Sequence, residues 1–272
     1  MNLAERVAIV TGGGGGIGGA LVARLAREGT RVVVADLDAE AARAVSETVN
    51  ADHRGTTVSA GADVSDNEQI QQLIDLAESV FGPVDFCFAN AGLGGALGLD
   101  VSEQDWDRSI DVNLRAHIRA ARLLVPRWLE RGEGYFVSTA SAAGLLTQIG
   151  SATYAVTKHA AVAFAEWLSV TYGDRGVRVS CLCPMGVNTR MLTAGEDSGD
   201  ALGRAATRAV TSAGDVLEPA EVADAVLAAI EDERFLVLPH EDVLEMYRQK
   251  SSDYDRWVRG MRRYRSSLLA QA

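Results

Sequence analysis

Tyr154 and Lys158, in the stretch YAVTK at 154 to 158, are a pair of side chains whose types and spacing suit proton transfer. Residues four apart share one face of a helix, so the Lys158 ammonium would lie beside the Tyr154 phenol. A free phenol titrates near pH ~10, and a neighbouring positive charge favours its ionised form. The pair is therefore a candidate general base near neutral pH, although the same spacing is also common between exposed residues.

The glycine-rich run TGGGGGIG at 11 to 18 is a second candidate for chemistry. An apolar strand-like run, RVAIV, precedes it, and Ile17, Leu21 and Leu25 recur at helical spacing after it. In a strand, turn and helix of this kind, glycine permits positive φ and a close approach of the backbone to a ligand. The helix N-terminus then offers unpaired N–H groups to phosphate. The run therefore predicts a phosphate cradle rather than a flexible linker.

An acidic residue is expected about 20 positions after the glycines of a dinucleotide-binding turn, at the end of a second strand. Asp36, at the end of RVVVAD, meets this requirement. Its carboxylate would accept hydrogen bonds from the adenosine ribose and repel a 2′-phosphate, which favours NAD over NADP. The alternative is an ordinary helix cap, a role for which Asp38 competes.

The composition is that of a globular protein, with 47% hydrophobic and 23% charged residues and a formal net charge of −11. An acidic surface opposes binding to nucleic acid or to anionic lipid. The N-terminal sequence lacks the sectors of a signal peptide, and no run reaches the ~18 apolar residues of a membrane span, so we expect a cytoplasmic protein. Three cysteines in apolar runs and four scattered histidines predict core thiols and no metal site.

Strand and helix patterns alternate along most of the chain. Besides the first strand, strand-like apolar runs stand at 31 to 36, 84 to 92, 135 to 141 and 177 to 184. Alternation of this kind predicts an α/β fold: a single Rossmann-fold domain, with a doubly wound, mainly parallel sheet and helices on both faces. We expect this domain to span 1 to 240 and a C-terminal helical extension to span 241 to 272.

Over about Val7 to Thr189, the sequence resembles the common, NAD-preferring type of short-chain dehydrogenase/reductase. TGGGGGIG matches the family's TGxxxGxG, and ADV at 62 to 64 matches its adenine-side motif. NAG at 90 to 92 and YAVTK match its central-strand motif and its YxxxK, and FLVLP at 235 to 239 is a looser match. The resemblance implies an NAD-dependent oxidoreductase that interconverts a secondary alcohol and a ketone by hydride transfer.

The resemblance also implies four catalytic residues. Tyr154 would exchange the proton, and Lys158 would bind the nicotinamide ribose. Ser141, in STASAAG, would hold the substrate oxygen, with Ser138 as the alternative serine. Asn113, in DVNLRAHI, would interrupt a helix and order a water that leads protons to solvent, although an interior asparagine can also simply bend a helix.

The cofactor contacts that the resemblance implies run from the pyrophosphate to the carboxamide. They are Gly12, Gly16, Ile17 and Gly18, then Asp36, then Asp63 and Val64, then Asn90, Ala91 and Gly92 with Tyr154 and Lys158, and finally Val187 and Thr189. No basic residue stands at Gly15, where NADP-using relatives often have one. The family usually has PG after its sixth strand, whereas this chain has CPMG, so Met185 either lines the pocket or packs into the core.

The segment 190 to 216 is rich in Gly, Ser and Asp and has the composition of a mobile lid over the substrate. The expected pocket wall is mostly apolar, and its residues are Leu93, Gly94, Gly95, Ala96, Leu145, Leu146, Thr147, Gln148 and Ile149. We therefore expect a neutral, hydrophobic small-molecule substrate (cyclic, aryl, terpenoid or steroid), with Arg190 as a candidate for an anionic group. The alternatives are a 3-ketoacyl-thioester reductase and a catalytically silent NAD-binding regulator.

The C-terminal stretch 248 to 265 carries seven Arg or Lys residues and two Asp. On an acidic protein, we expect it to dock against an acidic surface of its own or a neighbouring subunit, with Trp257 and Tyr264 as apolar anchors, rather than on a membrane or nucleic acid. The resemblance implies a homotetramer, or failing that a dimer, built on helices near 102 to 129 and 154 to 172.

Overall fold

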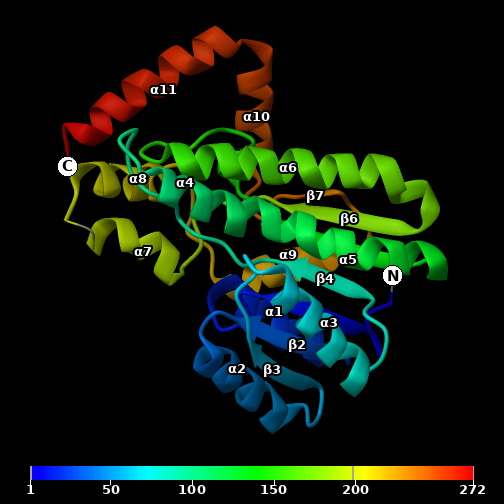
Figure 1. Ribbon diagram of the computed structural model, residues 1–272. Helices are drawn as coiled ribbons and strands as arrows, with labels where there is room; N and C mark the ends of the chain where they lie inside the picture. The colour runs from blue at the N-terminus through cyan, green and yellow to red at the C-terminus, as the bar shows by residue number, and fades with distance from the viewer. Residues whose placement is uncertain (1, 198, 272) are drawn as a thin grey trace.

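A computed structural model describes residues 2–197 and 199–271. Its centre is a sheet of seven parallel strands in the order β3-β2-β1-β4-β5-β6-β7 (Figure 1). The strands are β1 (Val7–Thr11), β2 (Arg31–Asp36), β3 (Thr57–Gly61), β4 (Phe86–Ala89), β5 (Gly134–Thr139), β6 (Val177–Leu182) and β7 (Leu236–Val237). The chain changes direction across the sheet between β1 and β4. The predicted doubly wound α/β fold is confirmed.

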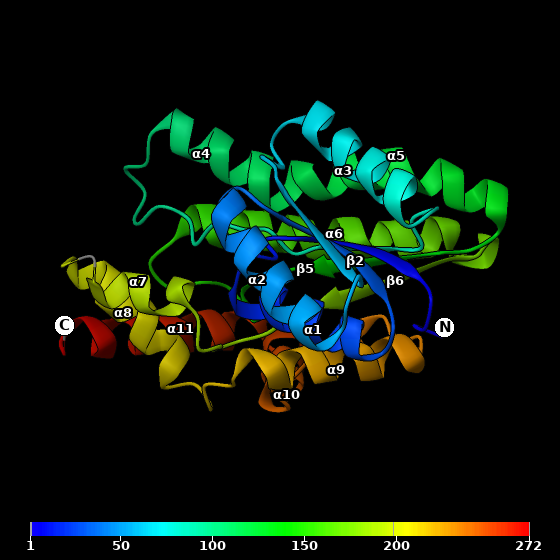
Figure 2. The ribbon, with the colours of Figure 1, turned by 90° about the horizontal axis from the view of Figure 1, so that it is seen from below.

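Helices cover both faces of the sheet, and the strand residues alternate between the two layers that result (Figure 2). Ala8 and Val10 pack under α1 (Gly16–Arg27), α2 (Ala39–Asp52) and α9 (Pro219–Glu231). Val7 and Ile9 pack under α3 (Asn67–Val80), α5 (Ala116–Arg131) and α6 (Ala152–Tyr172). The three cysteines are free and buried in these cores, as predicted.

Local hydrogen bonds decide two points that the sequence left open or missed. Asp38 caps α2 by accepting from the N–H groups of Glu40 and Ala41, so Asp36 is not the cap. The single helix expected near 102 to 129 is divided into α4 (Glu103–Ile110), a π-helical turn at Asp111–Arg115, and α5. The wider turn includes Asn113, where the resemblance to the family implied an interruption.

The segment expected as a lid and the C-terminal part form helices that lie outside the layered core. The segment expected as a lid contains α7 (Arg190–Asp197) and α8 (Ala201–Thr211). The C-terminal part contains α10 (Asp242–Ser252) and α11 (Tyr254–Leu269), and α11 lies beside α8 at the edge of the molecule (Figure 1).

Gly134, at the start of β5, allows Trp128 of α5 to lie flat against the backbone. A Cβ at Gly134 would be 2.1 Å from Trp128 Cγ, and the indole is fully buried with its Nε1 donating to Val84 O at 2.8 Å. We expect Gly134→Ala to lower the free energy of unfolding by about 1–3 kcal/mol through overpacking, measured by urea denaturation. The control is Gly260→Ala in α11, where an added Cβ would meet no atom within 4 Å. This change is expected to raise the free energy of unfolding, because alanine favours a helix over glycine. Equal losses in the two variants would contradict the packing argument.

Candidate active site

Hydrogen bonds between loop residues join the carboxyl ends of β1, β4 and β5. The Thr11 hydroxyl donates to Phe88 O at 3.2 Å and accepts from the N–H groups of Asn90 and Ala91 at 3.0 and 3.1 Å. The Asn90 amide donates to Thr11 O at 3.0 Å, and its oxygen accepts from the Thr139 hydroxyl at 3.2 Å. Asn90, predicted beside a ribose, therefore uses its side chain to hold three strand ends in register.

The glycine turn has the shape of an anion cradle. Gly12 and Gly16 have φ of +65° and +52°, which side chains rarely adopt, and a Cβ at Gly18 would lie 2.0 Å from Gly12 O. Helix α1 starts at Gly16 with no side-chain cap and no acidic residue in its first turn. Its first N–H groups are thus left to an anionic ligand. Thr189 packs over this turn, because a Cβ at Gly16 would be 3.1 Å from its methyl carbon.

Asp36 stands at the rim of the same cradle. Its Oδ2 accepts from Gly14 N at 2.9 Å and its Oδ1 from Asp38 N at 3.1 Å, which fixes the carboxylate and leaves further lone pairs on each oxygen. Asp63 is fixed in turn by Ser65 N at 2.8 Å, next to the buried Val64. Both Asp63 and Val64 line the cleft that begins at the cradle.

Tyr154 is in the first turn of α6 and lines the same cleft. The N-cap Ser151 accepts from Tyr154 N at 3.2 Å and donates to Ala96 O at 2.7 Å, so the loop after β4 and the start of α6 are held together. Burial raises the pKa of Tyr154, and a hydrogen bond with the Ser141 hydroxyl opposes that rise. The phenol is therefore protonated near neutral pH in this structure.

Lys158 is buried one turn further along α6, with 3% of its surface exposed. Its ammonium donates to Thr139 O at 2.9 Å and lies 5.6 Å from the centre of the Tyr154 ring. Burial lowers the pKa of Lys158 to about 8. The pKa of Tyr154 is thus raised and not lowered in this structure, because burial is the largest effect on it, and the Lys158 ammonium donates to the Thr139 carbonyl.

Ser141, and not its alternative Ser138, is at the cleft. Ser141 Oγ accepts from Ala143 N at 3.1 Å, donates to Pro184 O at 3.4 Å, and also hydrogen-bonds the Tyr154 phenol. Ser138 is fully buried, and its hydroxyl is 2.9 Å from His117 Nδ1. Burial, followed by the charge of Lys158, lowers the pKa of His117 to about 3, so this pair is a neutral core contact.

Asn113 is fully buried and does not line the cleft. Its oxygen accepts from Leu93 N at 2.7 Å, and its amide donates to Leu93 O at 3.0 Å and to the Thr157 hydroxyl at 3.1 Å. A Cβ at Gly92 would be 3.3 Å from Asn113 Oδ1 and 3.4 Å from Lys158 Nζ, so the two side chains are near neighbours. The structure thus places Asn113 behind Lys158, where it connects the loop after β4 to α6.

The segment after β6 is held by a histidine that the sequence did not single out. His240 Nδ1 accepts from Met185 N at 3.2 Å, and its Nε2 donates to Gly186 O at 2.9 Å, which specifies one neutral tautomer. Met185 both lines the cleft and packs partly against the core, so the two alternatives for it are combined. Val187 and Thr189 follow and line the cleft between the cradle and Tyr154.

These residues line one continuous cleft of about 1150 Å³. Its walls include every residue predicted to bind the cofactor, together with Ser141. Of the predicted substrate wall, Ala96 and Leu145 do not line it: Ala96 hydrogen-bonds Ser151 and Thr153 through its backbone, and Leu145 is buried in the core. The sequence missed four residues of the C-terminal helices that line the cleft, namely Met246, Trp257, Met261 and Tyr264.

The C-terminal helix α11 docks through apolar contacts and not through its charges. Leu268 is buried against Ile149 and Ala205, and the Tyr264 hydroxyl donates to Ala209 O at 3.1 Å. In the described part of the chain, none of the arginines of α11 forms an ion pair. Docking of this stretch on an acidic surface of its own subunit is therefore wrong. The regular spacing of Trp257, Met261, Tyr264 and Leu268 was the signal for an apolar face.

A model of the short chain dehydrogenase family matches residues 6–199. The chain belongs to this family of oxidoreductases. It is 38% identical over 267 residues to 1-deoxy-11-beta-hydroxypentalenate dehydrogenase of Streptomyces exfoliatus, which covers 95% of this chain and 91% of that protein. Cyclohexanol dehydrogenase of Acinetobacter sp. (strain SE19) is 32% identical over 196 residues, covering 71% of this chain and 78% of that protein. The resemblance seen in the sequence is confirmed.

A solved short-chain dehydrogenase/reductase from Burkholderia phymatum, in complex with NAD, superimposes with a TM-score of 0.85 at 31% identity, covering 94% of this chain and 96% of that one. Within residues 2–197 and 199–271, no helix is both long and apolar enough to span a bilayer. The same residues contain no group of three or more His, Cys, Asp or Glu side chains arranged to hold a metal ion.

The burial of Lys158 predicts a pH dependence of stability. Its pKa falls from 10.5 to about 8 on folding, so between these values the unfolded chain binds more protons and stability rises with pH. The quantity to measure is the difference in the free energy of unfolding between the wild type and Lys158→Met. We expect this difference (wild type minus variant) to increase by about 3 kcal/mol from pH 8 to pH 10.5. Chemical denaturation across this range measures it. A difference that stays constant with pH would contradict the burial argument.

Proposed function

We propose that this short-chain dehydrogenase is an NAD-dependent oxidoreductase that interconverts a secondary alcohol and a ketone on a hydrophobic small molecule. The observation that carries the proposal is the meeting of Ser141, Tyr154 and Lys158 in one cleft with the glycine cradle. One end of the cleft has the donors and the acid that a dinucleotide needs, and the other end is mostly apolar. The proton-transferring groups lie where the two ends join.

NAD fits the first end of the cleft. A Cβ at Gly12 would lie 2.9 Å from Ala91 Cα, so glycine is needed here for the turn to pack on the loop after β4, and Gly12, Gly15, Gly16 and Gly18 all line the cleft. Asp36 supports NAD over NADP because its fixed carboxylate would repel a 2′-phosphate, and Gly15 and the exposed Leu37 beside it bring no positive charge. The solved relative that contains NAD supports the same choice. When bound, NAD supplies the acceptor of the hydride.

The chain's own residues would handle the proton and the substrate oxygen. The substrate oxygen would lie between the Ser141 hydroxyl and the Tyr154 phenol, which donates its proton to a ketone oxygen during reduction and takes it back from the alcohol during oxidation. Because burial raises the phenol pKa, we expect oxidation to be faster at alkaline pH. Lys158 would hold the ribose, with Thr139 O fixing its ammonium and Asn113 behind it.

The substrate end of the cleft supports a hydrophobic cyclic, aryl, terpenoid or steroid alcohol. Leu146, Ile149, Met191 and Leu192 line it together with the C-terminal residues. The relatives that act on cyclohexanol and on a hydroxypentalenate support this class. Since the latter name denotes an acid anion, and Arg190 lines the cleft here, the substrate panel should include carboxylated alcohols.

Two alternatives have less support. A 3-ketoacyl-thioester reductase would usually need NADPH, and neither Asp36 nor Gly15 favours a 2′-phosphate. A catalytically silent NAD-binding regulator would not need the serine, tyrosine and lysine that meet in the cleft.

We also propose a cytoplasmic homotetramer, with a dimer as the alternative. Helix α6 exposes three large apolar side chains, with 52% of Val156, 54% of Trp167 and 80% of Val170 accessible. An apolar face of this kind on one of the two helices expected at the interface supports assembly.

The proposal is tested by following NADH at 340 nm with cyclohexanol, aryl, terpenoid and steroid alcohols and carboxylated analogues, at pH 7 and pH 9. We expect turnover of at least one cyclic class with NAD, faster at pH 9, and a loss of at least about 10³-fold in Tyr154→Phe. Ser138→Ala, away from the cleft, is the control and should keep its activity. Turnover that is unaffected in Tyr154→Phe would overturn the proposed role, and a panel with no turnover despite NAD binding would favour the regulator.

Cofactor choice is tested by Asp36→Ala. Removing the carboxylate should raise the KM for NAD and lower that for NADP, shifting the ratio of kcat/KM values towards NADP by about 10-fold or more. Asp38→Ala is the matched control, because Asp38 caps α2 and should change stability but not this ratio. An unchanged ratio in Asp36→Ala would refute the assignment.

A further inference from the structure

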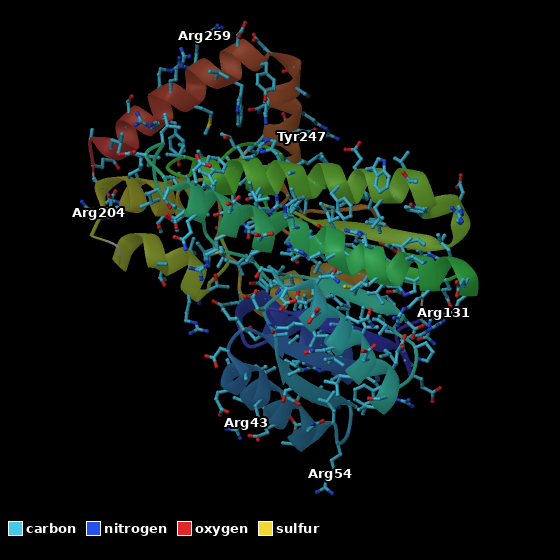
Figure 3. All side chains as sticks on the ribbon, viewed as in Figure 1. Arg43, Arg54, Arg131, Arg204, Tyr247 and Arg259 are labelled. Atoms are coloured by element: carbon cyan, nitrogen blue, oxygen red, sulfur yellow. The ribbon has the colours of Figure 1, made fainter. Side chains whose placement is uncertain are left out.

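The proposed reaction leaves one part of the cleft unexplained. Trp257, Met261 and Tyr264 of α11 and Met246 of α10 line it, although they lie outside the residues that match the family model. Trp257, Met261 and Tyr264 follow one another at helical spacing, so they share one face of α11. The arginines of α11 are exposed, and Arg259 points away from the molecule (Figure 3).

Helix α11 is joined to α8, the second helix of the segment expected as a lid. The Tyr264 hydroxyl donates at 3.1 Å to Ala209 O, a carbonyl in the last turn of α8, and the Arg208 side chain donates to Gln271 O. Leu268 is 4% exposed and packs on Ala205 of α8. These contacts make α8 and α11 one packed unit, and Ala206 and Val210 of α8 line the cleft as well.

The base of the same unit is tied to the segment that carries Ser141. The Lys250 ammonium, on α10 and 6% exposed, donates to Leu145 O at 2.6 Å and lies 5.4 Å from the centre of the Tyr254 ring. Ile149, further along this segment, packs on Leu268 and Ala205. The C-terminal helices are therefore fixed relative to the reacting groups and are not a loose tail.

We propose that α11 and α8 form the specificity wall of the substrate site, and that this wall selects alcohols with a rigid, multi-ring apolar body. The inference rests on the proposed function for the position of the reacting carbon, beside Ser141 and Tyr154. A one-ring alcohol held there would contact mainly residues of the family core, such as Leu146 and Ile149. A fused-ring body would extend further towards α11, where Trp257 offers an aromatic face and Met246 and Met261 can adapt to its outline.

The test compares cyclohexanol with a four-ring 3β-hydroxysteroid in the wild type, Trp257→Ala, Met261→Ala and Tyr264→Phe. We expect Trp257→Ala to raise the ratio of the steroid KM to the cyclohexanol KM by about tenfold or more, and Met261→Ala to raise it less. Tyr264→Phe keeps the ring and removes only the bond to Ala209 O, so it should leave the ratio within about threefold. Arg259→Ala, on the outer face of α11, is the matched control and should change neither KM.

Binding of the corresponding steroid ketone to the NADH-loaded protein, followed by calorimetric titration, gives a second readout that needs no turnover. A Kd for the ketone that rises about tenfold in Trp257→Ala supports the wall. This holds even if the wild type turns over neither alcohol, because the absence of turnover counts against the proposed function and not against the wall. Equal changes for both alcohols in Trp257→Ala would show that α11 acts only on the stability of the site and would overturn the inference. Failure of the wild type to bind the ketone, or a ratio that no variant changes, would also overturn it.

Discussion

The relative position of the glycine cradle and the Ser141 segment depends on the hydrogen bonds that join three strand ends at the carboxyl edge of the sheet. Parallel strands stop there with backbone groups that have no partner in the next strand. The Thr11 hydroxyl and the Asn90 amide supply those partners and connect β1, β4 and β5. The glycine cradle follows β1 and the serine segment follows β5, so one small network fixes the distance between the end that would bind phosphate and the groups that would transfer a proton. Rigidity at this edge is what a hydride transfer between two bound molecules requires.

The same edge determines the electrostatics of the proton-transferring pair. The Thr139 carbonyl accepts a hydrogen bond from Lys158 and so favours the charged form of the amine. The surrounding core opposes that charge, because burial lowers the pKa of Lys158. Burial acts in opposite directions on the two groups, because it penalises the phenolate of Tyr154 and the ammonium of Lys158 alike. The pKa of the phenol therefore rises, and that of the amine falls to about 8. Above that pH, the phenol keeps its proton while Lys158 loses its own. A protonated phenol can donate to a ketone oxygen, and its deprotonated form, which can accept a proton, is favoured as the pH rises.

The sequence predicted the sheet and the order of its elements because apolar runs and glycine turns have local physical causes. The strand before TGGGGGIG and the helix after it are examples, whereas the break at Asn113, where the π-helical turn lies, was implied only by the resemblance to the family. It could not predict the direction of the Tyr154 pKa shift, because burial depends on residues distant in the chain, such as those around Thr139. It also could not identify the partner of α11. The apolar stripe from Trp257 to Leu268 requires a partner, but spacing alone does not say whether that partner is an acidic surface, another subunit or α8, and the seven basic residues favoured the wrong choice.

The contacts of α11 also explain how a conserved chemistry and a variable substrate can be combined in one chain. The reacting groups are fixed by the sheet edge, through backbone carbonyls and short polar side chains that lie on β1, β4, β5 and α6. The wall formed by α8 and α11 contacts the segment that carries Ser141 through a small number of interactions. These include the hydrogen bond from Lys250 to Leu145 O and the packing of Ile149 on Ala205 and Leu268. A substitution at Trp257 or Met261 therefore changes the space offered to the substrate without disturbing the groups that transfer the proton. Substitutions at distant sites that share no partners have nearly additive effects on free energy. The shape of the wall can therefore vary while the positions of Ser141, Tyr154 and Lys158 stay the same. The geometry thus separates the selection of the substrate from the reaction performed on it.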